Sequence, residues 1–147
     1  MCAIKQSGGE FDYHRELIAL GREKNFVVMS GADTRLPEVF KLGAAGCIGG
    51  LVNLVPDLMV AIERIGRGGQ PGEIGVPAAR MVELGRVIDQ LEFPLNVAAG
   101  IEARGLRPGA PKAIVSEESR RPYAKIVAEL GGCFARWGLE AATADVA

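Results

Sequence analysis

The sequence has few side chains that could hold a metal ion. It contains one histidine, His14, and three cysteines, Cys2, Cys47 and Cys133, among 147 residues. The cysteines are odd in number and far apart, and they form no CxxC pair, whereas a structural zinc site needs four sulfur or imidazole ligands with short spacings. The sequence therefore argues against a zinc site and predicts a reduced, cytoplasmic protein that uses no cofactor.

Excess charge and long apolar runs are also missing. A net charge of -1, from 17 basic and 18 acidic residues, gives no electrostatic reason to expect a nucleic acid or an anionic membrane as partner. No apolar run reaches the roughly 18 residues that span a bilayer, and the first residues do not resemble an export signal. With 48% hydrophobic and 24% charged residues, we expect a soluble globular protein.

Glycine, by contrast, is abundant, with 20 residues that fall in short clusters. Three of these clusters follow short apolar runs, at residues 1–4, 26–29 and 44–48. Apolar runs of this length without alternation are typical of parallel strands that are covered on both faces. Apolar residues at helical spacing follow each run, over residues 11–21, 33–42 and 55–66, and the first of these stretches places Leu17 and Ile18 on one face. Gly43 is expected to end the second helix, and Pro56 to lie in the first turn of the third. The first 66 residues therefore predict three βα units.

The pattern changes after Gly66. Residues 67–75 are rich in glycine and proline and predict a turn region, and further helices are expected near residues 81–91, 97–104 and 119–130, with Ser116 or Ser119 as a possible N-cap of the last one. We therefore predict an α/β fold with a βα part at 1–66 and a helical region at 67–147. Three parallel strands leave two open sheet edges, which suggests the last part of a larger structure such as an eight-stranded barrel.

Lys5 is the first candidate for chemistry, because it stands at the carboxyl end of the first predicted strand. In βα architectures the loops after the strands meet at that end and form the active site. A partly desolvated lysine there favours the free amine, which is a nucleophile for carbonyl carbons. The alternative is a surface lysine with a solvated head.

The segments around Lys5 resemble the dihydrodipicolinate synthase/N-acetylneuraminate lyase family. MCAIKQS at 1–7 is similar to the end of the family's Schiff-base lysine signature, although Gln6 stands where an acid is commoner. The further similar segments, in the family's order, are SGGEF at 7–11, FVVMSGAD at 26–33 and LGAAGCIGGLVN at 42–53. The resemblance is specific over the first 56 residues and looser beyond Gly66.

The resemblance implies the last three βα units of a TIM (β/α)8 barrel, followed by a helical region, in a metal-independent lyase or aldolase that acts on pyruvate or another 2-oxo acid. Lys5 matches the lysine that forms an imine with the keto group. Ile48 matches a residue that lies over the pyruvyl group, and Gly31 and Asp33 match positions that contact the distal part of the substrate in some members. Gly49 leaves room and a free backbone N–H near the site.

Each of these residues has a structural alternative. Ile48 could simply fill a barrel interior, Asp33 could be a helix N-cap, and Gly49 could serve only a tight turn. Four other residues carry structural expectations: Tyr13 and Tyr123 as packing residues, His14 as an interface or core residue, and Cys47 as a small hydrophobe.

Several functional hypotheses stay open. The family's carboxylate-binding hydroxyl pair and tyrosine belong to earlier strands, so the resemblance does not choose between dihydrodipicolinate synthase, 4-hydroxy-2-oxoglutarate aldolase and 2-keto-3-deoxy sugar-acid aldolase. A second class is a truncated, non-catalytic homologue that acts by self-association or with a separate N-terminal half. A third, an anion-binding domain using Ser7-Gly8-Gly9, lacks any GxGxxG or GxxxxGK[ST] motif. The resemblance also implies a homo-oligomer.

Overall fold

The computed structural model describes residues 2–8, 10–68, 75–112 and 114–139. The chain divides into two compact units, Met1–Met81 and Val82–Ala147, and each is described by itself. The predicted division of the sequence between residues 66 and 67 stays a prediction.

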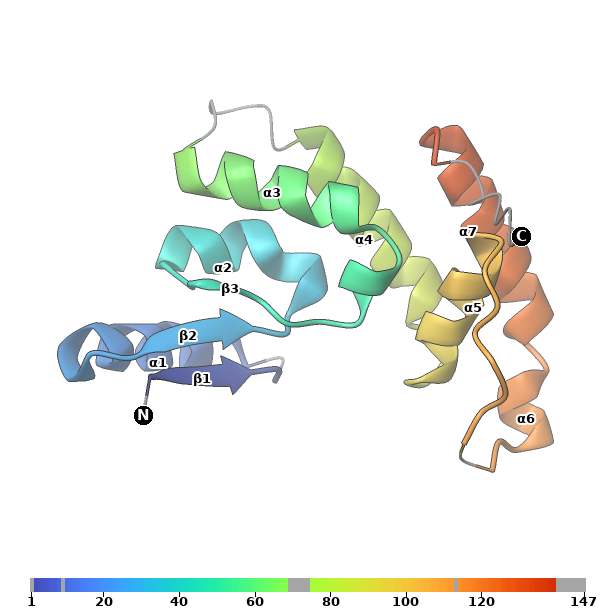
Figure 1. Ribbon diagram of the computed structural model, residues 1–147, viewed down its shortest axis with the longest axis horizontal. Helices are drawn as coiled ribbons and strands as arrows, with labels where there is room; N and C mark the ends of the chain where they lie inside the picture. The colour runs from blue at the N-terminus through green and yellow to red at the C-terminus, as the bar shows by residue number, and fades with distance from the viewer. Residues whose placement is uncertain (1, 9, 69–74, 113, 140–147) are drawn as a thin grey trace, which may run out of the picture. The chain divides into compact units, whose positions relative to one another are not determined.

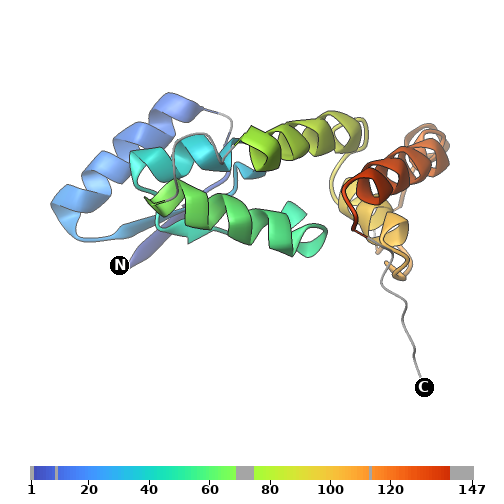
Figure 2. The same ribbon diagram turned by 90° about the horizontal axis from the view of Figure 1, so that it is seen from above.

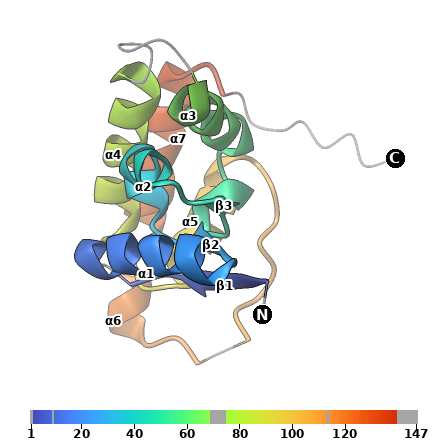
Figure 3. The ribbon, with the colours of Figure 1, turned by 90° about the vertical axis from the view of Figure 1, so that its left-hand side faces the viewer.

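The first unit contains a three-stranded parallel sheet in the order β1-β2-β3 (Figures 1 and 3). The strands are β1 at Ala3–Gln6, β2 at Val27–Ser30 and β3 at Gly46–Cys47. Each lies within or beside one of the apolar runs that predicted it. The third strand is only two residues long and pairs with Met29 and Ser30 at the end of β2.

The helical segments described in this unit, besides the start of α4 (Gly75–Ile88), are α1 at Phe11–Lys24, η1 at Asp33–Arg35, α2 at Leu36–Leu42, η2 at Leu51–Asn53 and α3 at Pro56–Gly68. Gly43, with φ of 102°, ends α2 as predicted, and Pro56 opens α3 as predicted. Helix α1 continues beyond Gly21, the last residue of the predicted apolar pattern, to Lys24. Gly21 is a packing position, since a Cβ there would lie 2.6 Å from the carbonyl oxygen of Phe26.

The core of this unit lies on one face of the sheet. Leu17 and Ile18 of α1 and Val39 of α2 form a buried cluster with Val28 of β2, and Ile4 of β1 packs against it. Figure 2 shows α1 on one side of the strands. Because side chains alternate along a strand, the neighbours of Ile4 and Val28 point to the opposite face.

That opposite face is defined here as the open face, and it carries Ala3 and Lys5 of β1 and Val27 of β2. All three side chains are exposed, with Val27 at 49%. No described residue covers them as α1 and α2 cover Val28. The sheet therefore has a closed face that holds the core and an open face that carries Lys5.

The second unit is helical in its described residues. It contains the end of α4 (Gly75–Ile88), then α5 at Leu95–Ala103, α6 at Glu117–Arg120 and α7 at Tyr123–Arg136. Helices α5 and α7 pack side by side, with Ile126 and Leu130 of α7 buried (Figures 1 and 2). Among the described residues, no helix has both the length and the apolar character needed to cross a membrane.

Two expectations for this part of the chain need correction. The single helix predicted at 119–130 is two helices, α6 and α7, and the second continues to Arg136. Ser116 is the N-cap of α6, with its Oγ accepting a hydrogen bond of 3.1 Å from the Ser119 backbone N–H. Of the predicted turn region, residues 67 and 68 belong to α3 and Gly75 opens α4, while 69–74 lie outside the described residues.

Candidate active site

Lys5 lies on the open face of the sheet, and it pairs with Met29 of β2 in the parallel ladder. Its side chain runs toward Gly31, just beyond the end of β2. A Cβ built on Gly31 would lie 3.1 Å from Lys5 Cε and 2.6 Å from the hydroxyl oxygen of Ser7. Gly31 therefore leaves the space that the lysine and the serine share. The described residues leave Lys5 exposed, so they do not form the partly desolvated mouth that the sequence suggested.

Ile48 shares the open face with Lys5. Its backbone N–H donates a 2.8 Å hydrogen bond to the Ser30 carbonyl, which continues the β2–β3 ladder by one step. Gly46 pairs with Met29 in the same row as Lys5, and Ile48 comes two residues later, so alternation returns it to that face. The Ile48 side chain is 49% exposed and is not buried in the described part of the chain. Its role over a pyruvyl group stays a prediction.

Asp33 does not act as the helix N-cap that was its structural alternative. The N-cap positions of η1 and α2 are Ala32 and Arg35, and neither makes a side-chain capping hydrogen bond. The Asp33 carboxylate instead reaches across to the chain after β3. Its Oδ1 accepts a 3.2 Å hydrogen bond from the Cys47 thiol, and its Oδ2 accepts a 3.0 Å bond from the Leu51 backbone N–H.

Gly49 is next to this carboxylate. A Cβ at Gly49 would overlap the Asp33 carboxyl group, so any side chain there would displace Asp33 or the loop. The sequence-based alternatives for Gly49, a tight turn or room for substrate, did not include this contact. The two residues were both candidates from the sequence, and the structure brings them together.

The expectation that Cys47 behaves as a small hydrophobe was wrong. Its thiol is half-buried and donates to Asp33. Burial, followed by the hydrogen bond and the negative charge of Asp33, raises the pKa of Cys47 to about 12, and the positive charge of Lys5 opposes part of this rise. Cys47 is thus a neutral donor at physiological pH, within electrostatic reach of both Asp33 and Lys5.

A buried polar pair supports the loop after β2 from the closed face. His14 of α1 is 1% exposed, which confirms the expectation of a core histidine, and its Nε2 lies 3.1 Å from the Ser30 hydroxyl oxygen. That oxygen also accepts a 3.0 Å bond from the Ala32 N–H. Sequence reasoning missed the role of Ser30, although the Ser30-Gly31 pair was visible as a strand-to-loop junction. The signal that could have found it is that Ser30, a polar residue, directly follows the apolar run at 26–29.

The two tyrosines differ from each other. Tyr13 on α1 is 50% exposed, so the expectation that it is a packing residue was wrong. Tyr123, in the second unit, is partly buried and its hydroxyl donates a 3.0 Å hydrogen bond to Glu102. Burial and this carboxylate raise the pKa of Tyr123 to about 12. Tyr123 therefore packs, as expected, with its hydroxyl paired.

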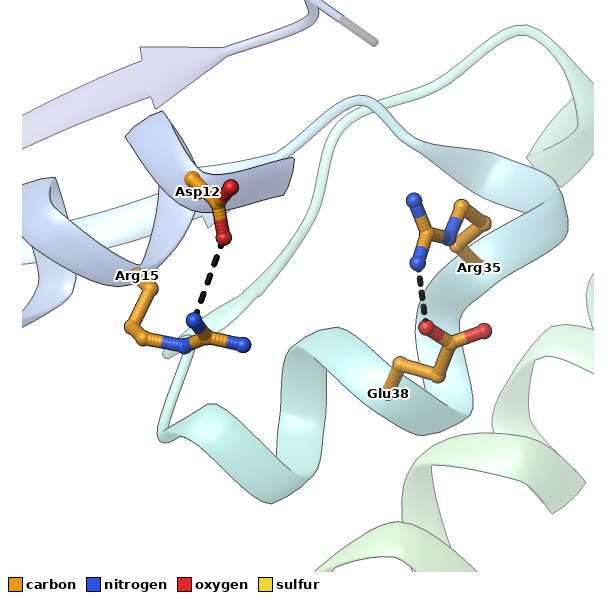
Figure 4. Close-up of polar contacts among 4 residues, drawn as sticks. All are labelled: Asp12, Arg15, Arg35 and Glu38. Atoms are coloured by element: carbon orange, nitrogen blue, oxygen red, sulfur yellow. Dashed lines mark hydrogen bonds and ion pairs between the residues drawn. The ribbon is translucent and has the colours of Figure 1, made fainter. Parts of the chain in front are cut away.

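Charged side chains near the starts of α1 and α2 form exposed ion pairs (Figure 4). Arg15 pairs with Asp12 at 3.1 Å, and Arg35 pairs with Glu38 at 2.5 Å. Pairs of this exposure contribute little to stability. In the described ranges, no three His, Cys, Asp or Glu side chains gather as a metal site would require.

Comparison with known proteins identifies a family. A family model described as the dihydrodipicolinate synthetase family matches residues 1–130. A curated relative, 4-hydroxy-tetrahydrodipicolinate synthase of Methanococcoides burtonii, is 28% identical over 136 residues, which cover 87% of this chain and 45% of the relative. The chain thus spans about half the length of that relative.

Two solved structures show the fold. Dihydrodipicolinate synthase from Bacteroides thetaiotaomicron has a TM-score of 0.76 at 17% identity, covering 89% of this chain and 46% of that one. A prophage protein of the dihydrodipicolinic acid synthase family from Escherichia coli, solved with pyruvate, has a TM-score of 0.73 at 20% identity, covering 95% of this chain and 47% of that one. The three βα units are therefore part of a TIM barrel, followed by helices, as the sequence predicted.

Proposed function

The chain belongs to the dihydrodipicolinate synthetase family, and from this membership we propose that it carries the imine-forming lysine, Lys5, of a lyase or aldolase that acts on a 2-oxo acid. Pyruvate is the proposed small-molecule partner, which is supported by the pyruvate in the related prophage protein. The candidate enzymes within the family are dihydrodipicolinate synthase, 4-hydroxy-2-oxoglutarate aldolase and 2-keto-3-deoxy sugar-acid aldolase. We also propose a cytoplasmic homo-oligomer.

The proposed chemistry begins at the Lys5 amine. The neutral amine attacks the keto carbon, a carbinolamine forms, and water leaves to give a protonated imine. That imine is an electron sink, so a carbon–carbon bond two atoms away can break or form through an enamine. Each proton transfer needs a general acid or base, whose contribution is typically about 10² to 10⁴-fold.

One observation supports this role most strongly: the Lys5 side chain lies on the open face against Gly31, and Ile48 lies on the same face. Gly31 has no side chain to block the lysine, and the amine is at the carboxyl end of the sheet, where βα folds hold their substrates. The chain covers 45% of its curated relative, so the remaining proton donors are proposed to come from the rest of such a protein.

Borohydride trapping tests the proposal. Borohydride delivers hydride to the imine carbon and converts it to a stable secondary amine, so the protein gains the mass of one reduced pyruvyl group. We expect this adduct with pyruvate, and its loss in Lys5→Ala. The matched control, Lys41→Ala, removes an exposed lysine of α2 and should leave trapping unchanged. Equal trapping in Lys5→Ala and the parent protein would contradict the assignment.

A second candidate function is association without catalysis, either with a second copy or with a separate N-terminal half. The exposed Val27 and Ile48 on the open face, and the outer edge of β1, which pairs with no strand in the described residues, favour it. Sedimentation of the 15.5 kDa chain together with borohydride trapping distinguishes the candidates, because an assembly that traps no pyruvate fits only the second. A stable folded monomer that traps pyruvate would argue against obligatory pairing.

A further inference from the structure

We propose that Asp33 is a positioning residue of this site, whose carboxylate fastens the chain that follows β3 and thereby holds Ile48 on the face that carries Lys5. The inference rests on the proposed function for its catalytic meaning. The contacts of Asp33 do not depend on the proposed function, and they can be tested without any reaction.

Both carboxylate oxygens of Asp33 accept hydrogen bonds, and the two donors lie at opposite ends of one short segment. Oδ1 accepts from the Cys47 thiol at 3.2 Å, and Oδ2 accepts from the Leu51 N–H at 3.0 Å. Residues 48–50 lie between these two donors. A carboxylate that accepts two hydrogen bonds across a loop fixes it more firmly than a neutral acceptor would, since hydrogen bonds to charged groups are the stronger ones.

The third anchor of this segment is the sheet. The Ile48 N–H donates to the Ser30 carbonyl at 2.8 Å, so β2 holds Ile48 on one side while Asp33 holds its flanks. Gly49 completes the fit, because only a residue without a Cβ leaves space for the carboxylate. Ile48 is 49% exposed and has little packing of its own, so its position depends on these backbone anchors.

This role differs from that of a substrate contact in a way that can be measured. Pyruvate has no distal part beyond its methyl group. If Asp33 only contacted the distal part of a longer substrate, its loss would leave pyruvate trapping intact. If Asp33 positions Ile48, its loss weakens pyruvate trapping as well, because the surface over the pyruvyl group is no longer held.

The first experiment reads the fastening directly, through hydrogen exchange of the Leu51 amide and alkylation of Cys47, each mapped by mass spectrometry. In Asp33→Ala we expect Leu51 exchange to accelerate by about tenfold or more, as for the loss of a bond to a charged acceptor. We expect the Cys47 pKa, about 12 with Asp33 in place, to fall in part, because the hydrogen bond and charge of Asp33 are lost while burial, the largest cause of the rise, remains, so that alkylation at pH 9 becomes faster. Cys2, which is exposed, is the internal reference.

Two variants control this experiment. Asp33→Asn keeps the size and one acceptor oxygen, so we expect smaller changes in the same directions. Asp12→Ala removes an exposed carboxylate of α1 that pairs with Arg15, and should change neither readout. Unchanged Leu51 exchange and Cys47 alkylation in a folded Asp33→Asn or Asp33→Ala protein would overturn the proposal.

The second experiment connects the fastening to the site. We expect pyruvate trapping on Lys5 to fall by about tenfold in Cys47→Ala, and to be restored in Cys47→Ser, whose hydroxyl can still donate to Asp33. Equal trapping in both variants would contradict the proposed link to Ile48. If the parent protein traps no pyruvate at all, the proposed function fails, while the exchange and alkylation results still decide whether Asp33 fastens the loop.

Discussion

The two faces of the small sheet differ in what their side chains do. On the closed face, Val28 is 3% exposed and packs with Leu17 and Ile18, and Ser30 forms a buried pair with His14. On the open face, Val27 is 49% exposed and Lys5 points along the sheet toward Gly31. Neighbouring residues of one strand therefore serve different purposes, and alternation along the strand separates them.

In the first unit, stability and the proposed chemistry therefore depend on different faces of the sheet. Burial of apolar area on the closed face stabilises the unit, since each buried aliphatic side chain contributes roughly 1.5–3 kcal/mol. The open face contributes little burial of its own in the described residues. Substitutions on the closed face should therefore change stability, and substitutions on the open face should change reactivity.

The adjacent valines of β2 provide the largest expected contrast. Val28→Ala removes two buried carbons and leaves a cavity, so we expect the free energy of unfolding to fall by about 2 to 3 kcal/mol. Val27→Ala on the open face should change it by less than about 0.5 kcal/mol. Urea unfolding followed by circular dichroism measures both. Equal losses in the two variants would mean that the open face is also covered.

A smaller loss is expected at the polar pair of the closed face. Ser30→Ala removes the hydroxyl that meets His14 Nε2 and accepts the Ala32 N–H, and leaves both partners unsatisfied. We expect a loss of about 1 to 2 kcal/mol in the free energy of unfolding. Ser30→Thr, which keeps the hydroxyl, serves as the comparison. If Ser30→Ala were as stable as the parent, the pair would have no part in anchoring the loop.

The smallest effect on stability, with a clear effect on reactivity, is expected at Gly31. In Gly31→Ala the new methyl group would press on the Lys5 and Ser7 side chains, which can rotate, so we expect less than about 1 kcal/mol of lost stability. Pyruvate trapping on Lys5 should fall severalfold. Gly68→Ala, which adds a methyl group where nothing lies within 4 Å, is the matched control. Undiminished trapping in Gly31→Ala would mean that Lys5 does not need the space that Gly31 leaves.

The sequence predicted the parts of this arrangement that depend on local pattern. Apolar runs followed by glycine clusters predicted the three strands and their parallel pairing in βα units. The spacing of Leu17 and Ile18 predicted the buried side of α1. Gly43 and Pro56 marked helix ends, because their backbone preferences act within a few residues.

Contacts between distant segments were beyond that pattern. The Asp33 carboxylate meets Cys47 and Leu51 only because the sheet brings the loops after β2 and β3 together, so Asp33 looked like a helix cap and Cys47 like a hydrophobe. The exposure of Tyr13 was missed for a related reason. Helical spacing shows which residues share a face of α1, but it does not show how far around the helix the packing against that face reaches. The similarity to a known family, not periodicity, singled out Lys5 and Ile48.

Whether Lys5 is the reactive lysine can be read from a peptide map of the protein after reduction with borohydride in the presence of pyruvate. The chain has four other lysines that serve as internal controls, Lys24, Lys41, Lys112 and Lys125. We expect the reduced pyruvyl group on Lys5, at a far higher occupancy than on any of these four. An even distribution over all five lysines, or an adduct that avoids Lys5 in folded protein, would contradict this expectation.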